Sequence, residues 1–177
     1  MYRIDQLLKE ERHLFHTRDL AIIWGIANDN TLYTTIKRYV KKGVLIPIHK
    51  GFYSTLSLEK IDPLELGATA LNFYSYISCE YILALHGIIF QQLNYITLTS
   101  SVSKKFKAGK QEYLVRKLSD IYLFNDTGIF EENGVKKATP ERAAADMLHF
   151  NPDFHFDNKK GLDPAKLGKV RKEVGYI

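Results

Sequence analysis

The sequence is poor in cysteine and in long apolar runs. Cys79 is the only cysteine among 177 residues, which excludes an intramolecular disulfide and a cysteine-based zinc site and fits a reducing compartment. The most apolar stretch, residues 81–90, contains His86 and has about half the length that a bilayer-spanning helix needs. Residues 2–9 are amphipathic and lack an apolar signal core. We therefore expect a cytoplasmic protein without a membrane partner.

Sequence motifs for several kinds of catalysis are also missing. Residues 108–110 lack the preceding glycine and the following serine or threonine of a phosphate-binding loop. A Gly-Ser pair followed by paired aspartates, which a nucleotidyltransferase would have, is absent, and no serine or cysteine nucleophile has a base at a recognisable spacing. We therefore expect no catalytic residue, no cofactor and no metal ion, and predict that the protein is not an enzyme.

One short segment has the letters of a metal-dependent nuclease. Pro152-Asp153 and Asp157-Asn158-Lys159 are similar to the two halves of a signature in which carboxylates hold a metal ion and a lysine assists the attacking water. Only residues 154–156 separate the halves, which is too short for the two adjacent strands of such a site. A polar connector between helices is the favoured interpretation, and a nuclease remains the weakest alternative.

Acidic residues are absent from residues 30–58, which carry five lysines and arginines. The whole chain has 25 Lys and Arg against 20 Asp and Glu, a net charge of +5. Residues 1–60 contribute ten against six, or +4, and residues 61–177 contribute fifteen against fourteen, or +1. This asymmetry favours a polyanionic partner at the N-terminal end.

Hydrophobic periodicity predicts an α+β fold that divides near residue 60. In the first part, helical spacing and a following pair of apolar runs predict three helices and a β-hairpin, at residues 2–12, 18–24 with Thr17 as the cap, 30–42, 44–48 and 52–56. Three helices followed by a hairpin are the order of a winged helix-turn-helix module. We therefore predict a winged helix-turn-helix DNA-binding domain over residues 1–60.

The second part, residues 61–177, is expected to form a mixed α/β domain. The patterns predict helices at residues 63–73, 79–86, 140–149 and 164–174, and strands at residues 96–100, 112–118 and 121–124. Thr139 and Pro140 give a strong start to the third of these helices, since threonine caps the helix and proline fits its first turn. No internal repeat interrupts this region.

The helix predicted over residues 30–42 has two different sides. Leu32, Ile36 and Val40 form an apolar stripe, whereas the other side offers amides, hydroxyls and cations, the groups that contact base edges and phosphates. The residues expected to read bases are Asn28, Asn30, Thr31, Thr34 and Arg38. The residues expected to contact the DNA backbone are Thr17, Tyr33, Lys37, Lys41, Lys42, His49 and Lys50. The alternative is a solvated helix with an ordinary charged face.

Three stretches together resemble a known family. They are residues 30–43 with the Lys50-Gly51-Phe52-Tyr53 segment, residues 78–89, and residues 138–148 with Thr139-Pro140-Glu141-Arg142. In this order they resemble the AbiEi-type antitoxins, the regulator half of the AbiE abortive-infection toxin–antitoxin systems. The resemblance implies an N-terminal winged helix-turn-helix, a C-terminal antitoxin domain and repression through repeats in the system's own promoter. It also implies neutralisation of a nucleotidyltransferase-like toxin in the type IV manner, which requires no stable complex.

A second basic run contains Lys104, Lys105, Lys107 and Lys110 around a hairpin tip expected at Gly109. Three interpretations remain open: a second phosphate-contacting surface, a surface for an acidic face of the toxin or for an RNA, and a solvated hairpin that its lysines protect from edge pairing.

The expected function is sequence-specific binding of double-stranded DNA, with repression of a toxin–antitoxin operon. Because operator repeats mirror protein symmetry or paired monomers, we expect two molecules per operator, with a possible dimer on DNA. The alternative is an antitoxin or adaptor that acts mainly through protein contacts of residues 61–177.

Overall fold

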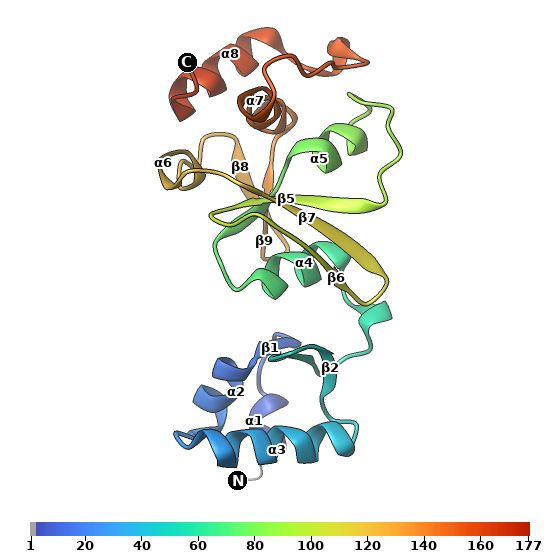
Figure 1. The fold of residues 1–177 in the computed structure, drawn as a ribbon, viewed down its shortest axis with the longest axis vertical. Coiled ribbons are helices and arrows are strands. Elements are labelled where there is room, and N and C mark those ends of the chain that lie inside the picture. The colour runs from blue at the N-terminus through green and yellow to red at the C-terminus, as the bar shows by residue number, and fades with distance from the viewer. Residues whose placement is uncertain (1–2) are drawn as a thin grey trace. The chain divides into compact units, whose positions relative to one another are not determined.

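The computed structural model describes residues 3–177 (Figure 1). They form two compact units, one up to Asp62 and one from Pro63 to Ile177. Tyr2, which belongs to the first expected helix, lies outside the described residues. No helix in the described part of the chain is long and apolar enough to cross a bilayer.

The first unit contains helices and a small antiparallel sheet. Its elements are α1 (Arg3–Leu7), β1 (Leu14–His16), α2 (Thr17–Trp24), α3 (Asp29–Lys41), β2 (Ile46–His49), β3 (Phe52–Ser54) and the 3₁₀ turn η1 (Leu58–Lys60). The strand order is β1-β3-β2, so Pro47 lies on an edge strand as its missing N–H requires. The first helix was expected over residues 2–12 but ends at Leu7, and Leu14 beyond it belongs to β1, which pairs with β3.

The core of the first unit lies between its helices and the sheet. Phe15, Leu20 and Leu32 are buried there, and the rings of Trp24 and Tyr39 stack with centroids 5.3 Å apart. Both rings are buried in this core.

The second unit is built around a six-stranded mixed sheet. Its strands follow the order β6-β7-β5-β4-β9-β8, in which β5–β7 and β4–β9 are parallel pairs and the other pairs are antiparallel. The strands are β4 (Ser75–Ile77), β5 (Tyr95–Ser100), β6 (Lys104–Ala108), β7 (Gln111–Lys117), β8 (Ile129–Glu132) and β9 (Val135–Ala138). The helices are α4 (Pro63–Leu71), α5 (Cys79–Leu85), α6 (Asp120–Leu123), α7 (Pro140–Phe150), the 3₁₀ turn η2 (Lys159–Gly161) and α8 (Pro164–Val174).

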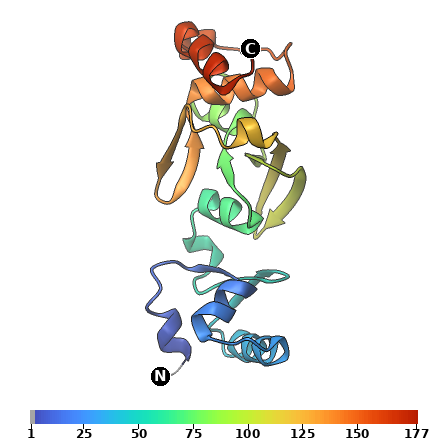
Figure 2. The ribbon, with the colours of Figure 1, turned by 90° about the vertical axis from the view of Figure 1, so that its left-hand side faces the viewer.

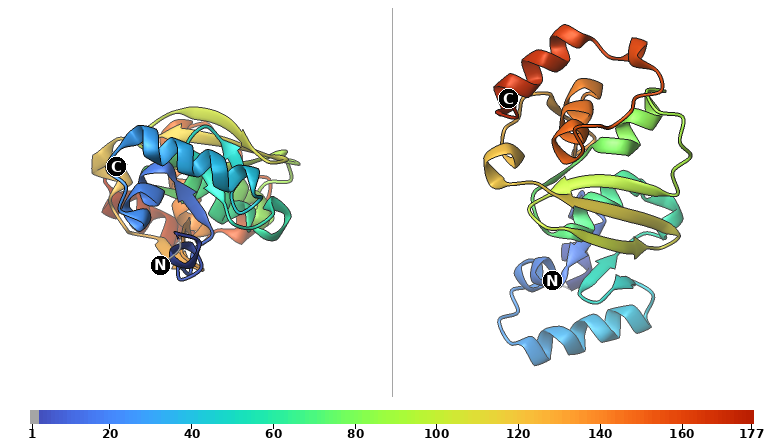
Figure 3. Two further views of the ribbon diagram at one scale, coloured as in Figure 1. Left: turned by 90° about the horizontal axis from the view of Figure 1, so that it is seen from below. Right: turned by 45° about the horizontal axis from the view of Figure 1, so that its top comes forward.

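Helices cover both faces of this sheet. Helix α4 lies on one face, and α5 and α7 lie on the other, with α8 packed on α7 (Figures 2 and 3). Helix α4 packs closely on β7 at Gly67. A Cβ atom added to this glycine would lie 2.3 Å from the ring of Tyr113, so only glycine fits here without a shift. The mixed α+β class predicted for the chain is therefore confirmed.

Several local predictions for the second unit need correction. Residues 121–124 were expected to form a strand, but Asp120–Leu123 form the short helix α6, with Ser119 at its N-cap. Strands β4, β8 and β9 were not expected. Helix α8 has the predicted bounds, and Thr139 caps α7 as predicted, since its hydroxyl accepts a hydrogen bond from Arg142 N.

Candidate nucleic-acid interface

Helix α3 is held by a side-chain cap at one end and by a left-handed glycine at the other. Asn28 is the N-cap, and its Oδ1 accepts hydrogen bonds from Thr31 N at 3.0 Å and from Thr31 Oγ1 at 3.2 Å. Gly43, at φ 71°, follows the last turn and ends the helix. The side-chain oxygen of Asn28 is therefore used to cap the helix, and the side-chain NH₂ group of Asn28 can donate to an outside partner.

The polar side of α3 is exposed as the sequence predicts. Leu32, Ile36 and Tyr39 are buried against the rest of the first unit. All of the expected contact positions between residues 30 and 42 are exposed. These eight residues are Asn30, Thr31, Tyr33, Thr34, Lys37, Arg38, Lys41 and Lys42. We call this set the outer face of α3. The carboxylate nearest to it in sequence is Asp29, in the first turn of the helix.

Arg3 also contributes to this face, although the sequence did not indicate it. Arg3 Nη1 donates a hydrogen bond to Thr35 Oγ1 at 3.0 Å, and Trp24 Nε1 donates to the Arg3 carbonyl at 3.1 Å, which fixes the backbone. A cavity of about 390 Å³ is lined by Arg3, Asn30, Thr31, Thr34, Thr35 and Arg38. The first helix therefore adds a guanidinium beside the expected base-reading residues, a contact that spans 32 positions in sequence.

The β2–β3 hairpin presents the remaining expected residues. Lys50 lies exposed in its turn. The ring of His49 is half-buried against Phe52, with centroids 5.1 Å apart, and its Nδ1 lies 3.2 Å from the Lys50 carbonyl oxygen. His49 therefore has a structural role in the hairpin.

Thr17 differs from its expected local role. It is the first residue of α2, and the N-cap is His16, whose backbone N–H donates to Asp19 Oδ2 at 2.7 Å. Thr17 N donates to the Gly51 carbonyl at 2.9 Å, and Thr17 Oγ1 donates to the same oxygen at 3.3 Å. Thr17 thus joins the start of α2 to the hairpin turn.

The second basic run lies on the edge strand of the larger sheet. Lys104, Lys105 and Lys107 are exposed on β6, and Lys110 is exposed in the turn to β7. The predicted hairpin with Gly109 at its tip is confirmed, since β6 pairs with β7 from Lys104 to Ala108.

The residues with nuclease-like letters are placed in the connector after α7. Asp157 Oδ2 accepts a hydrogen bond from Phe90 N at 2.8 Å, and His155 and Asp153 are exposed. Across residues 3–177, no group of three or more His, Cys, Asp or Glu side chains is arranged to hold a metal ion.

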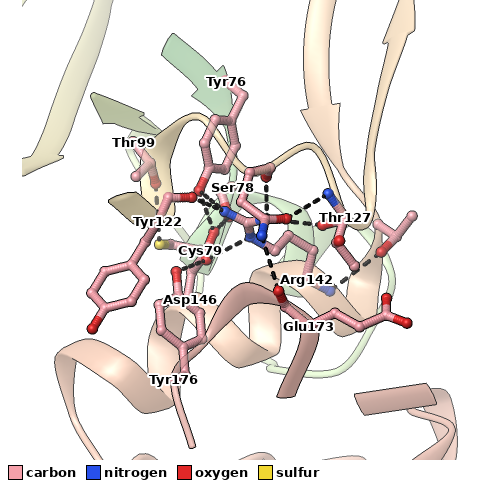
Figure 4. A network of polar contacts seen from close by, with 12 residues as sticks. Tyr76, Ser78, Cys79, Thr99, Tyr122, Thr127, Arg142, Asp146, Glu173 and Tyr176 are labelled. Atoms are coloured by element: carbon pink, nitrogen blue, oxygen red, sulfur yellow. Dashed lines mark hydrogen bonds and ion pairs between the residues drawn. The ribbon is translucent and has the colours of Figure 1, made fainter. Parts of the chain in front are cut away.

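A buried polar network fixes α7 against the sheet in the second unit (Figure 4). Arg142 is fully buried and uses every donor of its guanidinium: Nε donates to Asp146 Oδ1, and the terminal nitrogens donate to the carbonyls of Tyr122, Asn125 and Thr127 and to Tyr76 Oη. Asp146 Oδ2 accepts hydrogen bonds from Tyr76 and Ser78, at 3.0 and 2.7 Å, and Oδ1 also accepts one from Tyr176, at 2.6 Å. This complete pairing is what makes a buried ion pair tolerable.

The same burial changes the titration of its members. Burial first, and then the Asp146 carboxylate, raise the pKa of the Tyr76 and Tyr176 hydroxyls, so both stay protonated. Burial likewise raises the pKa of the Cys79 thiol. Ser78 occupies the N-cap position of α5, but its hydroxyl donates to Asp146 and not to a backbone group of the helix. The i, i+4 spacing of Arg142 and Asp146 within an alanine-rich helix was the available signal.

Comparison with known proteins adds information on the fold. No family model matches the chain, and no curated protein matches it. Among solved structures it is similar to the Rv2827c protein of Mycobacterium tuberculosis, with a TM-score of 0.55 and 12% sequence identity, over 98% of this chain and 73% of that one. At this identity the likeness concerns the fold alone.

Proposed function

We propose that the first unit is a winged helix-turn-helix module and that the protein is a sequence-specific repressor that binds double-stranded DNA. In this proposal α2 and α3 are the two helices of the motif, α3 enters the major groove, and the β2–β3 hairpin is the wing. Arg38, Asn30 and Thr34 then face base edges, while Lys41 and Lys42 face phosphates.

The observation that carries the proposal is the composition of the outer face of α3. The 13-residue helix α3 buries Leu32, Ile36 and Tyr39 and exposes an amide, hydroxyls and three cations, and Lys42 adds a fourth exposed cation at its C-cap. In the described chain none of those cations, which are Lys37, Arg38, Lys41 and Lys42, forms an ion pair. Cations without an ion pair, hydroxyls and an exposed amide on one helix are groups that bind phosphates and base edges.

The operon context is the second part of the proposal. The stretches of sequence that resemble AbiEi-type antitoxins include residues 78–89 and 138–148, and these contain α5 and α7, which pack together on one face of the sheet. Their packing supports the view that these two stretches belong to one folded domain. We propose an autoregulating antitoxin that represses its own promoter and neutralises a nucleotidyltransferase-like toxin without a stable complex.

DNA binding is tested by titrating the full chain against a labelled duplex from its own upstream region and against a scrambled duplex of equal length. The expected result is a strong preference for the upstream duplex. Arg38→Ala should weaken that binding by about 1–3 kcal/mol if the contact to a guanine is bidentate, and should weaken scrambled DNA less. Lys60→Ala, an exposed cation outside the outer face of α3, is the matched control. Equal binding of both duplexes by the wild type would contradict sequence-specific recognition.

The antitoxin role needs a separate measurement. The full chain with Arg38→Ala and Lys42→Ala is co-expressed from a foreign promoter with the nucleotidyltransferase-like toxin encoded beside it. Protection of growth by this variant, together with loss of repression, is the expected result, because the proposal assigns repression to the first unit. If the wild-type chain fails to protect growth, the antitoxin role is contradicted, and the proposed repressor role is unaffected.

A further inference from the structure

The second unit has a cavity on the face of its sheet beside the edge strand β6. The cavity has a volume of about 420 Å³, and its lining residues are Tyr95, Lys105, Phe106, Lys107, Glu112, Tyr113 and Leu114. A volume of this size is typical of sites for small molecules or for single groups of a larger ligand.

The pairing register shows which side chains face the cavity. Lys105 lies opposite Leu114, and both Lys107 and Tyr95 lie opposite Glu112, so these five side chains share one face of the sheet. Phe106 and Tyr113 belong to the opposite face, where their rings stack with centroids 4.8 Å apart and Gly67 of α4 lies against Tyr113. Phe106 and Tyr113 therefore contribute backbone to the cavity.

The five facing side chains combine three chemistries. Tyr95 and Leu114 are half-buried and give a flat apolar surface. Lys105 and Lys107 are exposed ammonium groups two residues apart on one strand, a separation of about 6.6 Å. Glu112 is an exposed carboxylate, and within the described chain it forms no ion pair. The site thus offers apolar contact, two cations and one hydrogen-bond acceptor.

One end of the site is fixed by an ion pair on the same face of the sheet, because Arg116 alternates in phase with Glu112 and Leu114 along β7. Arg116, on β7 next to the cavity, is paired with Glu80 of α5 and lies over the ring of Phe150, 5.7 Å from its centroid. Burial, and then the Glu80 carboxylate, raise the pKa of the Tyr95 hydroxyl, so the phenol is neutral at physiological pH. A neutral aromatic ring on a rigid strand is a suitable stacking surface.

We propose that this cavity binds one nucleotide of a single-stranded nucleic acid, with the base against Tyr95 and Leu114, an exocyclic amino group on Glu112, and neighbouring phosphates on Lys105 and Lys107. The two lysines lie at a separation comparable to that of successive phosphates along an extended strand. An acidic protein surface would satisfy the lysines but would be repelled by Glu112. A base with an amino group satisfies all three chemistries, since a carboxylate accepts hydrogen bonds from cytosine N4. The site does not depend on duplex binding by the first unit.

The test uses the full chain and labelled ten-nucleotide single strands of cytosine or uracil, each as RNA and as DNA, in fluorescence anisotropy titrations. Tyr95→Ala should weaken binding about 5- to 150-fold, the range for loss of stacking on one base, and Tyr95→Phe should retain it. Lys105→Ala with Lys107→Ala should lower the salt slope by about 1.4, at 0.7 per phosphate of a single strand. Glu112→Gln should reduce the preference for cytosine over uracil.

Lys104→Ala is the matched control, because Lys104 is on the same strand and removes the same charge but lies on the opposite face, with its ammonium 5.4 Å from the Phe106 ring centroid. It should leave binding within about twofold of the wild type if charge outside the cavity matters little. Equal loss in Lys104→Ala and Lys105→Ala would overturn the proposal in favour of diffuse attraction. If poly-aspartate competes as effectively as unlabelled single strand, the proposal is overturned in favour of an acidic protein partner.

A variant with Arg38→Ala and Lys42→Ala separates this site from the proposed duplex interface. It should lose binding of the upstream duplex and keep binding of the single strands. If it loses both, one surface binds both ligands and the cavity is not a separate site. Unchanged thermal unfolding of each variant ensures that a loss of binding reflects a contact and not a loss of fold.

Discussion

The salt dependence of duplex binding is the most quantitative test of the charges around α3. Four lysines are expected on phosphates, Lys37, Lys41, Lys42 and Lys50; each is exposed, and in residues 3–177 none forms an ion pair. Each phosphate contact on duplex DNA contributes about 0.9 to the slope of log affinity against log salt. Four contacts predict a slope of about −3.6, so affinity should fall about 150-fold between 50 and 200 mM salt.

Removing one lysine gives the corresponding difference. Lys42→Ala should change the slope to about −2.7, which corresponds to an approximately 40-fold fall over the same range, and should weaken upstream and scrambled duplexes alike. The assay is anisotropy titration at four salt concentrations between these limits. Lys60→Ala should leave the slope unchanged. A wild-type slope near zero would refute phosphate binding by this face, and an unchanged slope in Lys42→Ala would remove that residue from the phosphate contacts.

The second unit allows three further predictions. Arg142→Met should lower the free energy of unfolding by about 3–5 kcal/mol in urea titrations, because Asp146 stays buried without its cation; a loss below about 1 kcal/mol would contradict this reasoning. Gly67→Ala should cost about 1–3 kcal/mol, because the new methyl group would overlap the Tyr113 ring, and an unchanged urea midpoint would show that α4 moves freely. Stability should be fully present below pH 10 and fall as pH rises above it, because the pKa of Tyr176 is raised in the folded state; the fall should be shallower in Tyr176→Phe.

Elements with complete local signals were predictable from the sequence. Thr139 with Pro140 marks the start of α7, and Asp163 with Pro164 marks that of α8, because capping side chains and proline act within one turn. The polar side of α3 was likewise predictable, since helical periodicity alone separates Arg38 from Ile36.

Features that depend on distant partners were not predictable. Leu14 has helical spacing to the residues before it, yet it pairs with Ser54 in β1. Arg3 reaches the outer face of α3 only because Trp24 and Thr35 hold it there. Strand β4 has three residues, and its pairing with β5 and β9 defines it more than its composition does. Tertiary pairing overrides local preference at each of these positions.

The position of β6 at the sheet edge also affects how copies of the protein meet in solution. An edge strand offers unpaired backbone groups on which another strand can add, and repeated addition leads to aggregates. Two β6 strands brought side by side would bring the lysines at 104, 105 and 107 close to the lysines of the second copy, and like charges on paired strands are destabilising. The lysines therefore oppose self-addition at this edge. Replacing these lysines with alanine removes the charge repulsion at the sheet edge and favours strand addition between copies. Binding assays with such variants therefore require that the protein is monodisperse.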